Sequence, residues 1–289
     1  MATTTSTNLG DKVKEISIVD SILDNRQLAE VGIIGKFNLI KADGPIKIIA
    51  ENENLKASFY GEMETVATAD NSLIEYQLNP NKRVAQAIEV SRELLETSGV
   101  DYAQHISQLM TTRIARTIES AILSSGVDNN TKNLPRIHSL ANINDTGTST
   151  NPLSATVVRQ AYFNFLNNNN NLDGAFWLFS KSSNLSVQDT AGNELLKFDN
   201  VPKGANAMLL GIPVYFVNLG DTTDATPKIT RAMLINPNAY TIALKDNTVK
   251  QIAGDTTQSL RGSSVFLGEV YVDGKMTNSY GKYAISQPS

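Results

Sequence analysis

The chain has no cysteine among its 289 residues, and only two histidines and one tryptophan. The absence of cysteine excludes disulfide bridges and thiolate metal sites. The only histidines are His105 and His138, which leaves few candidates for a Ser–His nucleophile pair or a histidine metal site. The G-x-S-x-G elbow, the Walker A loop and the G-x-G-x-x-G turn are missing as well. We therefore expect no catalytic, cofactor-binding or metal-binding residues, and no enzyme activity.

Long hydrophobic runs and an excess of positive charge are also absent. No apolar run approaches the ~20 residues that a membrane helix needs, so no membrane partner is expected. The first residues, MATTTSTNLGDKVKE, contain no apolar segment typical of a secretory signal. A net charge of −4 argues against binding nucleic acid through bulk electrostatics. Composition thus predicts a soluble, mildly acidic protein made in the cytoplasm, with two packed subdomains.

The most regular pattern lies between residues 101 and 125 and predicts one long amphipathic helix. Asp101 and Gln104 have the spacing of a capping box at its start, and Gly126 suits the left-handed position that ends a helix. At 1.5 Å per residue the helix would be roughly 36 Å long. Its apolar positions recur at three- and four-residue steps and should form one buried stripe: Tyr102, Ile106, Leu109, Met110, Ile114, Ile118, Ala121 and Ile122.

Before this helix, alternating apolar residues from Gly35 to Leu78 predict a long β-hairpin or extended loop. An isolated two-stranded hairpin is marginal in water, so this one should lie on a neighbouring surface. Its middle is acidic, with a single lysine, Lys56, against Glu51, Glu53, Glu62, Glu64, Asp70 and Glu75. A calcium site would need ligand spacing that is missing here, which favours a charged surface over a cation site.

The flanking regions predict an arm at one end and a mixed α+β region at the other. Residues 1–33 have too little apolar surface to fold alone, and we expect them to become ordered by packing on something else. After the long helix, Ser154 should cap a second helix that ends in the run 167–171. Strands are predicted at 175–180, 213–217, 232–235 and 241–244. Asp273-Gly274 is predicted to form a type I′ turn between two final strands.

Three local patterns, in this order, resemble the major capsid protein of tailed double-stranded DNA bacteriophages, which has the Hong Kong 97-type fold. The first is Val90–Gly126, a strand followed by SRELLETS and a long helix that closes in AILSSG. The second is LSVQDTAGNELL, at Leu185–Leu196, which follows the apolar strand AFWLFS. The third is MLLGIPVYFVN, at Met208–Asn218, which is similar to the family's L-L-G-x-P-V turn.

The resemblance implies four regions. They are an N-terminal arm in residues 1–33, an extended E-loop in residues 34–80, a peripheral domain in residues 81–133 and 246–289, and an axial domain in residues 134–245. Because only a short arm precedes the E-loop, scaffolding is expected to be a separate protein, unless this chain is a processed form. Portal and decoration proteins are the other partners that the resemblance suggests.

The implied function is structural. Such a chain self-assembles into pentamers and hexamers of an icosahedral head that encloses double-stranded DNA without sequence-specific binding. It would be located in the virion capsid and assembled in the host bacterial cytoplasm. The acidic E-loop would lie on a basic surface of a neighbour, for which Arg113 and Arg116 are candidates.

One chemistry of the family is not extended to this chain, and two other functions stay open. Some relatives cross-link covalently through an E-loop lysine, but no convincing Asn and Glu partners for Lys56 stand near Val265–Tyr271. An encapsulin-like compartment uses the same fold to enclose an enzyme, and sequence separates the two poorly. An uncharacterised hydrolase would need a polar cluster that converges in a pocket.

Overall fold

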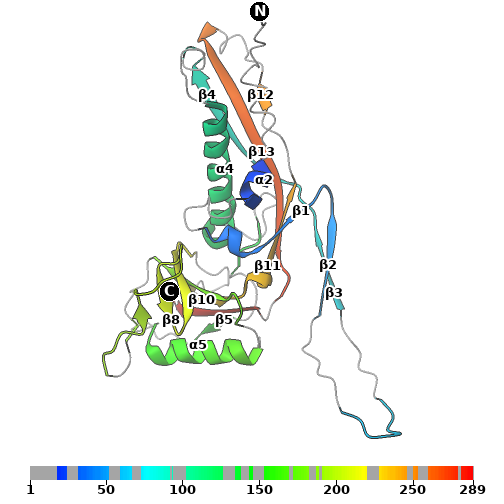
Figure 1. The fold of residues 1–289 in the computed structure, drawn as a ribbon, viewed down its shortest axis with the longest axis vertical. Coiled ribbons are helices and arrows are strands. Elements are labelled where there is room, and N and C mark those ends of the chain that lie inside the picture. Colours follow the sequence, from blue (N-terminus) through cyan, green and yellow to red (C-terminus); the bar gives the residue numbers. More distant parts are fainter. Residues whose placement is uncertain are drawn as a thin grey trace, which may run out of the picture.

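The computed structural model describes residues 18–24, 32–51, 59–66, 73–91, 93, 102–125, 134–137, 143–145, 153–168, 172–181, 187–188, 191–219, 228–245, 250–252, 260–278 and 281–288. Helix α4 (Tyr102–Ser120) and strand β13 (Ser263–Met276) run side by side through one part of the molecule (Figure 1). Helix α5 (Ala155–Asn168) and a second sheet form another part, and a hairpin projects away from both (Figure 1).

Helix α4 confirms the predicted long amphipathic helix, and a π-helical turn, Ala121–Ser125, continues it. Five of the predicted apolar positions are at most 3 % exposed: Ile106, Met110, Ile114, Ile118 and Ile122. Leu109 and Ala121 are partly buried, whereas His105 lies exposed on the other face. Asp101 and Gly126, the predicted ends of the helix, lie outside the described residues. Among the helices that are described, none is both long enough and apolar enough to cross a membrane.

The buried face of α4 packs on a five-stranded sheet that is centred on β13. Strand β4 (Lys82–Ser91) pairs antiparallel with β13 along one edge, from Lys82 opposite Val272 to Ser91 opposite Ser263. On the other edge β13 pairs antiparallel with β11 (Tyr240–Lys245) and β12 (Lys250–Ile252). Strand β1 (Asn38–Lys41) adds to β11 in parallel. One strand thus holds the sheet together.

The predicted type I′ turn at Asp273-Gly274 is wrong, because β13 runs straight through this dipeptide. Gly274 lies opposite Ile242 of β11. A Cβ on Gly274 would lie 2.6 Å from the hydroxyl oxygen of Tyr240. That hydroxyl donates a hydrogen bond of 2.7 Å to the carbonyl oxygen of Pro135. The glycine is required because an aromatic ring covers the strand, a contact between residues that are distant in sequence.

The second sheet has seven strands, and α5 packs on two of them, β14 and β10. Its order is β5 (Ile143–Asp145), β14 (Lys282–Pro288), β10 (Lys228–Ile235), β6 (Phe176–Ser180), β9 (Ile212–Val217), β8 (Ala207–Leu209) and β7 (Leu196–Lys197). The strands predicted at 175–180, 213–217, 232–235 and 241–244 are confirmed as β6, β9, β10 and β11. Ser154 caps α5 as predicted, since its Oγ accepts a hydrogen bond of 3.4 Å from the backbone N–H of Val157.

Strand pairing differs from the regions implied by the resemblance at three places. Strand β11, expected in the axial domain, pairs with β13, and β14, expected in the peripheral domain, pairs with β10. Strand β1, expected in the E-loop, belongs to the five-stranded sheet. Short helical turns at Ile34–Lys36 and Pro237–Ala239 lead into β1 and β11. The division into four regions itself stays a prediction.

Part of the N-terminal arm belongs to the subunit's own core. Helix α2 (Ile18–Asp24) packs on α4 and β13, and Ile18, Val19 and Ile22 are at most 1 % exposed. For these residues, the surface on which the arm packs is provided by α4 and β13 of the same subunit. Those three apolar side chains suffice because α4 and β13 already form a surface that accepts them.

Substitution of Gly274 by alanine should destabilise the subunit, because the new methyl group collides with the Tyr240 ring and disturbs its hydrogen bond. Overpacking of this kind costs about 1–3 kcal/mol. Gly44→Ala is the matched control, since a Cβ there meets nothing within 4 Å, and it should change stability by less than about 0.5 kcal/mol. Denaturant unfolding of both variants measures the difference, and equal stabilities would contradict the packing argument.

Candidate functional site: the projecting hairpin

The projecting hairpin consists of β2 (Ile46–Glu51) and β3 (Leu73–Leu78), which confirms the predicted hairpin in this region. The two strands pair antiparallel, from Ile46 opposite Leu78 to Glu51 opposite Leu73. Among the described strands, neither pairs with any other. Beyond its root, the hairpin projects away from both larger sheets (Figure 1). Most of its surface therefore depends on something outside the subunit for cover.

One face of this hairpin is apolar along its whole paired length. Residues that lie directly opposite each other point to the same side of a two-stranded sheet. The pairs on this face are Ile46–Leu78, Ile48–Tyr76 and Ala50–Ile74. Among the described residues of this face, Leu78 at the root is fully buried against Ala42 and Ala243. Ile46, Ile48, Ile74 and Tyr76 are half-buried. The alternation thus provides an apolar strip that extends beyond the subunit's core.

The other face is mixed. It carries Lys47 and Ile49 on β2 and Glu75 and Gln77 on β3. Ile49 is 67 % exposed. Lys47 and Glu75 form an ion pair of 2.7 Å, but both side chains are more than half exposed, so the pair adds little stability.

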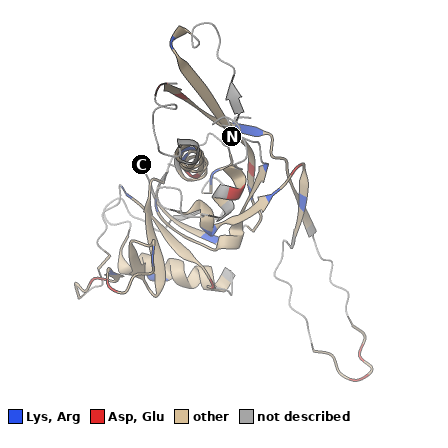
Figure 2. Cartoon of the chain, turned by 45° about the horizontal axis from the view of Figure 1, so that its top comes forward, with Lys and Arg blue, Asp and Glu red and all other residues tan. Residues whose placement is uncertain are grey.

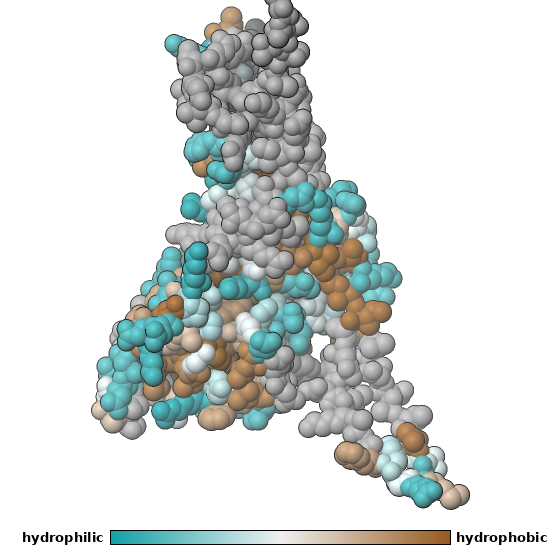
Figure 3. Space-filling view, in the orientation of Figure 1, coloured by the Kyte–Doolittle hydropathy of each residue, from teal (hydrophilic) through white to brown (hydrophobic). Residues whose placement is uncertain are grey.

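The described part of the hairpin tip, residues 59–66, exposes large apolar side chains. Phe59 and Met63 are fully exposed, at 106 % and 101 %, and Val66 is 64 % exposed. The same segment contains two glutamates, Glu62 and Glu64, and no lysine or arginine (Figure 2). Apolar and polar residues are interspersed there, apart from the rest of the surface (Figure 3). Exposed apolar groups gathered at a projecting tip are typical of a contact surface for another protein.

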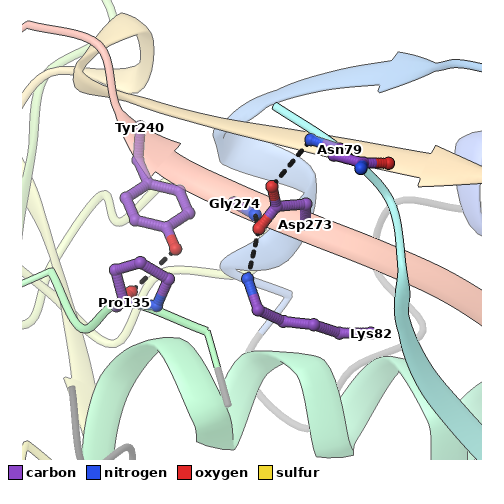
Figure 4. A network of polar contacts seen from close by, with 6 residues as sticks. All are labelled: Asn79, Lys82, Pro135, Tyr240, Asp273 and Gly274. Atoms are coloured by element: carbon purple, nitrogen blue, oxygen red, sulfur yellow. Dashed lines mark hydrogen bonds and ion pairs between the residues drawn. The ribbon is translucent and has the colours of Figure 1, made fainter. Parts of the chain in front are cut away.

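The root of the hairpin is anchored on β11 and β13. The Asp273 carboxylate accepts a hydrogen bond of 2.8 Å from the backbone N–H of Asn79, and it also pairs with the Lys82 ammonium (Figure 4). The Lys275 ammonium lies 5.7 Å from the centre of the Tyr76 ring. The side chains that hold the root thus come from a distant part of the sequence. No local motif predicted them, since the Asp273-Gly274 dipeptide pointed to a turn.

The remaining residues singled out from the sequence are distributed as follows. Arg113 and Arg116 lie exposed on the outer face of α4, where a neighbouring molecule could reach them. Trp177 is fully buried in β6, as expected of a core residue. Glu53, Lys56, Asp70 and His138 lie outside the described residues. Within the part of the chain that is described, no three His, Asp or Glu side chains are grouped so that they could hold a metal ion.

Comparison with known proteins places the chain in a family. The sequence profile of the phage capsid family matches residues 12–281. The capsid of a native GTA particle is similar in structure, with a TM-score of 0.62 and 13 % identity over 90 % of both chains. Structures from Microbacterium phage Oxtober96 and Gordonia phage Cozz are also similar. The first has a TM-score of 0.59 and 13 % identity, over 90 % of this chain and 91 % of that one. The second has a TM-score of 0.55 and 16 % identity, over 88 % and 85 %.

Matches at this level of identity establish the fold, which is α+β and of the Hong Kong 97 type. No individual curated protein sequence matches the chain significantly. Neither the encapsulin-like shell nor the hydrolase gains support from these comparisons. The profile covers nearly the whole chain. The chain belongs to the phage capsid family and is a structural capsid protein.

Proposed function

We propose that the chain self-assembles into the pentamers and hexamers of an icosahedral head that encloses double-stranded DNA. The observation that carries this proposal is the projecting hairpin, whose apolar face is only half-buried beyond Leu78 and whose tip exposes Phe59 and Met63 fully. A subunit of this kind gains stability when the strip and the tip lie on a neighbour. Many such weak contacts make a stable shell while single errors can still dissociate. The similar GTA capsid is described with C5 symmetry, which supports pentamers.

The inside of such a shell must not hold DNA tightly. A net charge of −4 suits this role, because phosphate binding requires a concentrated basic surface. DNA would then be enclosed without sequence-specific contacts. We propose a separate scaffolding protein, a portal and a decoration protein as partners, with assembly in the host cytoplasm and a final place in the virion. Residues 34–80, which include the hairpin, would act as the E-loop.

The direct test is the size of the purified full-length protein. Multi-angle light scattering and electron microscopy should detect capsomers or megadalton shells, alone or after addition of the phage's own scaffolding protein. A protein that stays monomeric under both conditions would contradict the proposal.

Charge reversal at the tip should impair assembly. We expect Glu62→Lys combined with Glu64→Lys to reduce particle yield, because the tip would then repel a basic surface that includes Arg113 and Arg116. Electron microscopy and sedimentation would measure the yield. Asp199→Lys, which reverses an exposed acid outside the hairpin, is the control and should assemble normally.

The same experiment can identify the partner of the tip. Reversing Arg113 and Arg116 to glutamate in the tip double variant should restore part of the yield if these residues face each other across the interface. Normal shells from the tip variant alone would refute the charge pairing.

Removal of apolar surface at the tip separates assembly from folding. Phe59→Ser with Met63→Ser should leave unfolding free energy within about 0.5 kcal/mol, because both side chains are exposed in the subunit. Particle yield should nevertheless fall, since the apolar contact with the neighbour is lost. Phe198→Ser, at a phenylalanine that is 59 % exposed outside the hairpin, is the matched control. An equal loss of particles in the control would show that the tip has no special role.

A further inference from the structure

The orientation of the hairpin is decided at the corner where the chain returns to the body of the subunit. Strand β3 ends at Leu78 in the two-stranded sheet, and β4 begins at Lys82 in the five-stranded sheet. The three residues between them, Asn79 to Asn81, include the buried Pro80. The corner is closed by a hydrogen bond of 2.7 Å from the backbone N–H of Asn81 to the carbonyl oxygen of Asn79. A change of backbone angles in these few residues would swing the whole hairpin.

A single carboxylate from a third strand contacts both sides of this corner. Asp273 of β13 accepts the backbone N–H of Asn79 through Oδ2, on the hairpin side. Through Oδ1 it pairs with the ammonium of Lys82, on the sheet side, and accepts the backbone N–H of Gly274 at 3.0 Å (Figure 4). Hydrogen bonds to an ionised carboxylate are among the stronger ones in proteins.

The Asp273–Lys82 ion pair is largely shielded from solvent. The side chains of Asp273 and Lys82 are only 16 % and 18 % exposed, so their attraction is screened less than that of a surface pair. The Lys47–Glu75 pair further along the hairpin is more than half exposed on both sides. Of these two ion pairs, only the one at Asp273 joins the hairpin corner to the body.

A second ion pair between the same two strands shows what is particular to Asp273. Arg83 of β4 and Glu269 of β13 are joined at 2.6 Å, close to the corner and also across the β4–β13 ladder. Both residues lie within the five-stranded sheet, so this pair joins two strands of one sheet. It provides a natural comparison, since it is also a carboxylate–cation pair between β4 and β13, but it is centred on Arg83 inside β4, whereas Asp273 bonds to Asn79 on the hairpin side of the corner.

We infer that Asp273 is a positioning residue that fixes the angle at which the hairpin leaves the subunit, and with it the place that the tip reaches on a neighbouring subunit. The tip lies at the far end of the hairpin, so a small rotation at the corner becomes a larger displacement there (Figure 1). Leu78, buried beside Ala42 and Ala243, keeps the root attached, while Asp273 sets its direction. The effect of Asp273 on assembly rests on the proposed function. Its effect on the hairpin angle in the free subunit does not.

Spin labels on the dispersed full-length subunit can measure this angle. The chain contains no cysteine, so Glu62→Cys at the tip and Gln108→Cys on the exposed face of α4 would be the only labelled sites. With Asp273 in place, pulsed electron resonance should yield one narrow distribution of distances between the labels. Asp273→Asn keeps the size of the side chain and one acceptor but removes the charge, and it should broaden the distribution and shift its maximum. Glu269→Gln is the matched control and should leave the distribution narrow.

The outcomes separate the two proposals. An unchanged distribution in Asp273→Asn, or an equal broadening in Glu269→Gln, would overturn the role of Asp273 whether or not shells form. If Asp273→Asn does not fold, Lys82→Met tests the other side of the same contact and must produce the same broadening. A wild-type subunit with a narrow distribution that never assembles would count against the proposed function alone.

Discussion

Where α4 and α2 cover β13, side chains of both helices lie directly on the backbone of Gly268. A Cβ on Gly268 would lie 2.9 Å from the Met110 sulfur and 2.9 Å from Cδ1 of Ile18. Two helices thus lie directly on the strand that also pairs with β4, β11 and β12. The apolar stripe of α4 packs on β13, which is continuous at this point. Without this contact, neither the five-stranded sheet nor the root of the hairpin would have a support.

This support makes the projecting hairpin possible. In the described residues the subunit anchors the root of the hairpin through Leu78 and Asp273, leaves the apolar strip half-buried and exposes the tip. A two-stranded ribbon alone has too little buried surface to be stable in water. Its stability is therefore shared between the subunit that anchors it and the neighbour that we propose to cover it. Such sharing makes assembly reversible until many contacts have formed.

Prediction succeeded where a local pattern was sufficient and failed where distant residues decided the structure. The stripe on α4, the cap at Ser154 and the buried strand β6 each follow from periodicity or from a side chain that acts within a few residues. The turn predicted at Asp273-Gly274 was wrong, since the ring of Tyr240 and not a reversal of the chain accounts for the glycine. The expectation that the arm packs on another surface fits helix α2, but only the structure identifies α4 and β13 of the same subunit as that surface.

The amino-acid sequence by itself determined the long helix, the acidic hairpin, the α+β class and, through the order of three motifs, the capsid family. The helix, the hairpin and the class depend on patterns between near neighbours along the chain, whereas the family rests on the resemblance of those motifs to known capsid proteins. Only the tertiary structure decided that β11 and β14 lie in opposite sheets from those expected, and that Asp273 holds the hairpin corner. Those features depend on contacts between residues nearly two hundred positions apart, such as Asn79 and Asp273. Tertiary packing brings such residues into contact, and no local sequence pattern predicts these contacts.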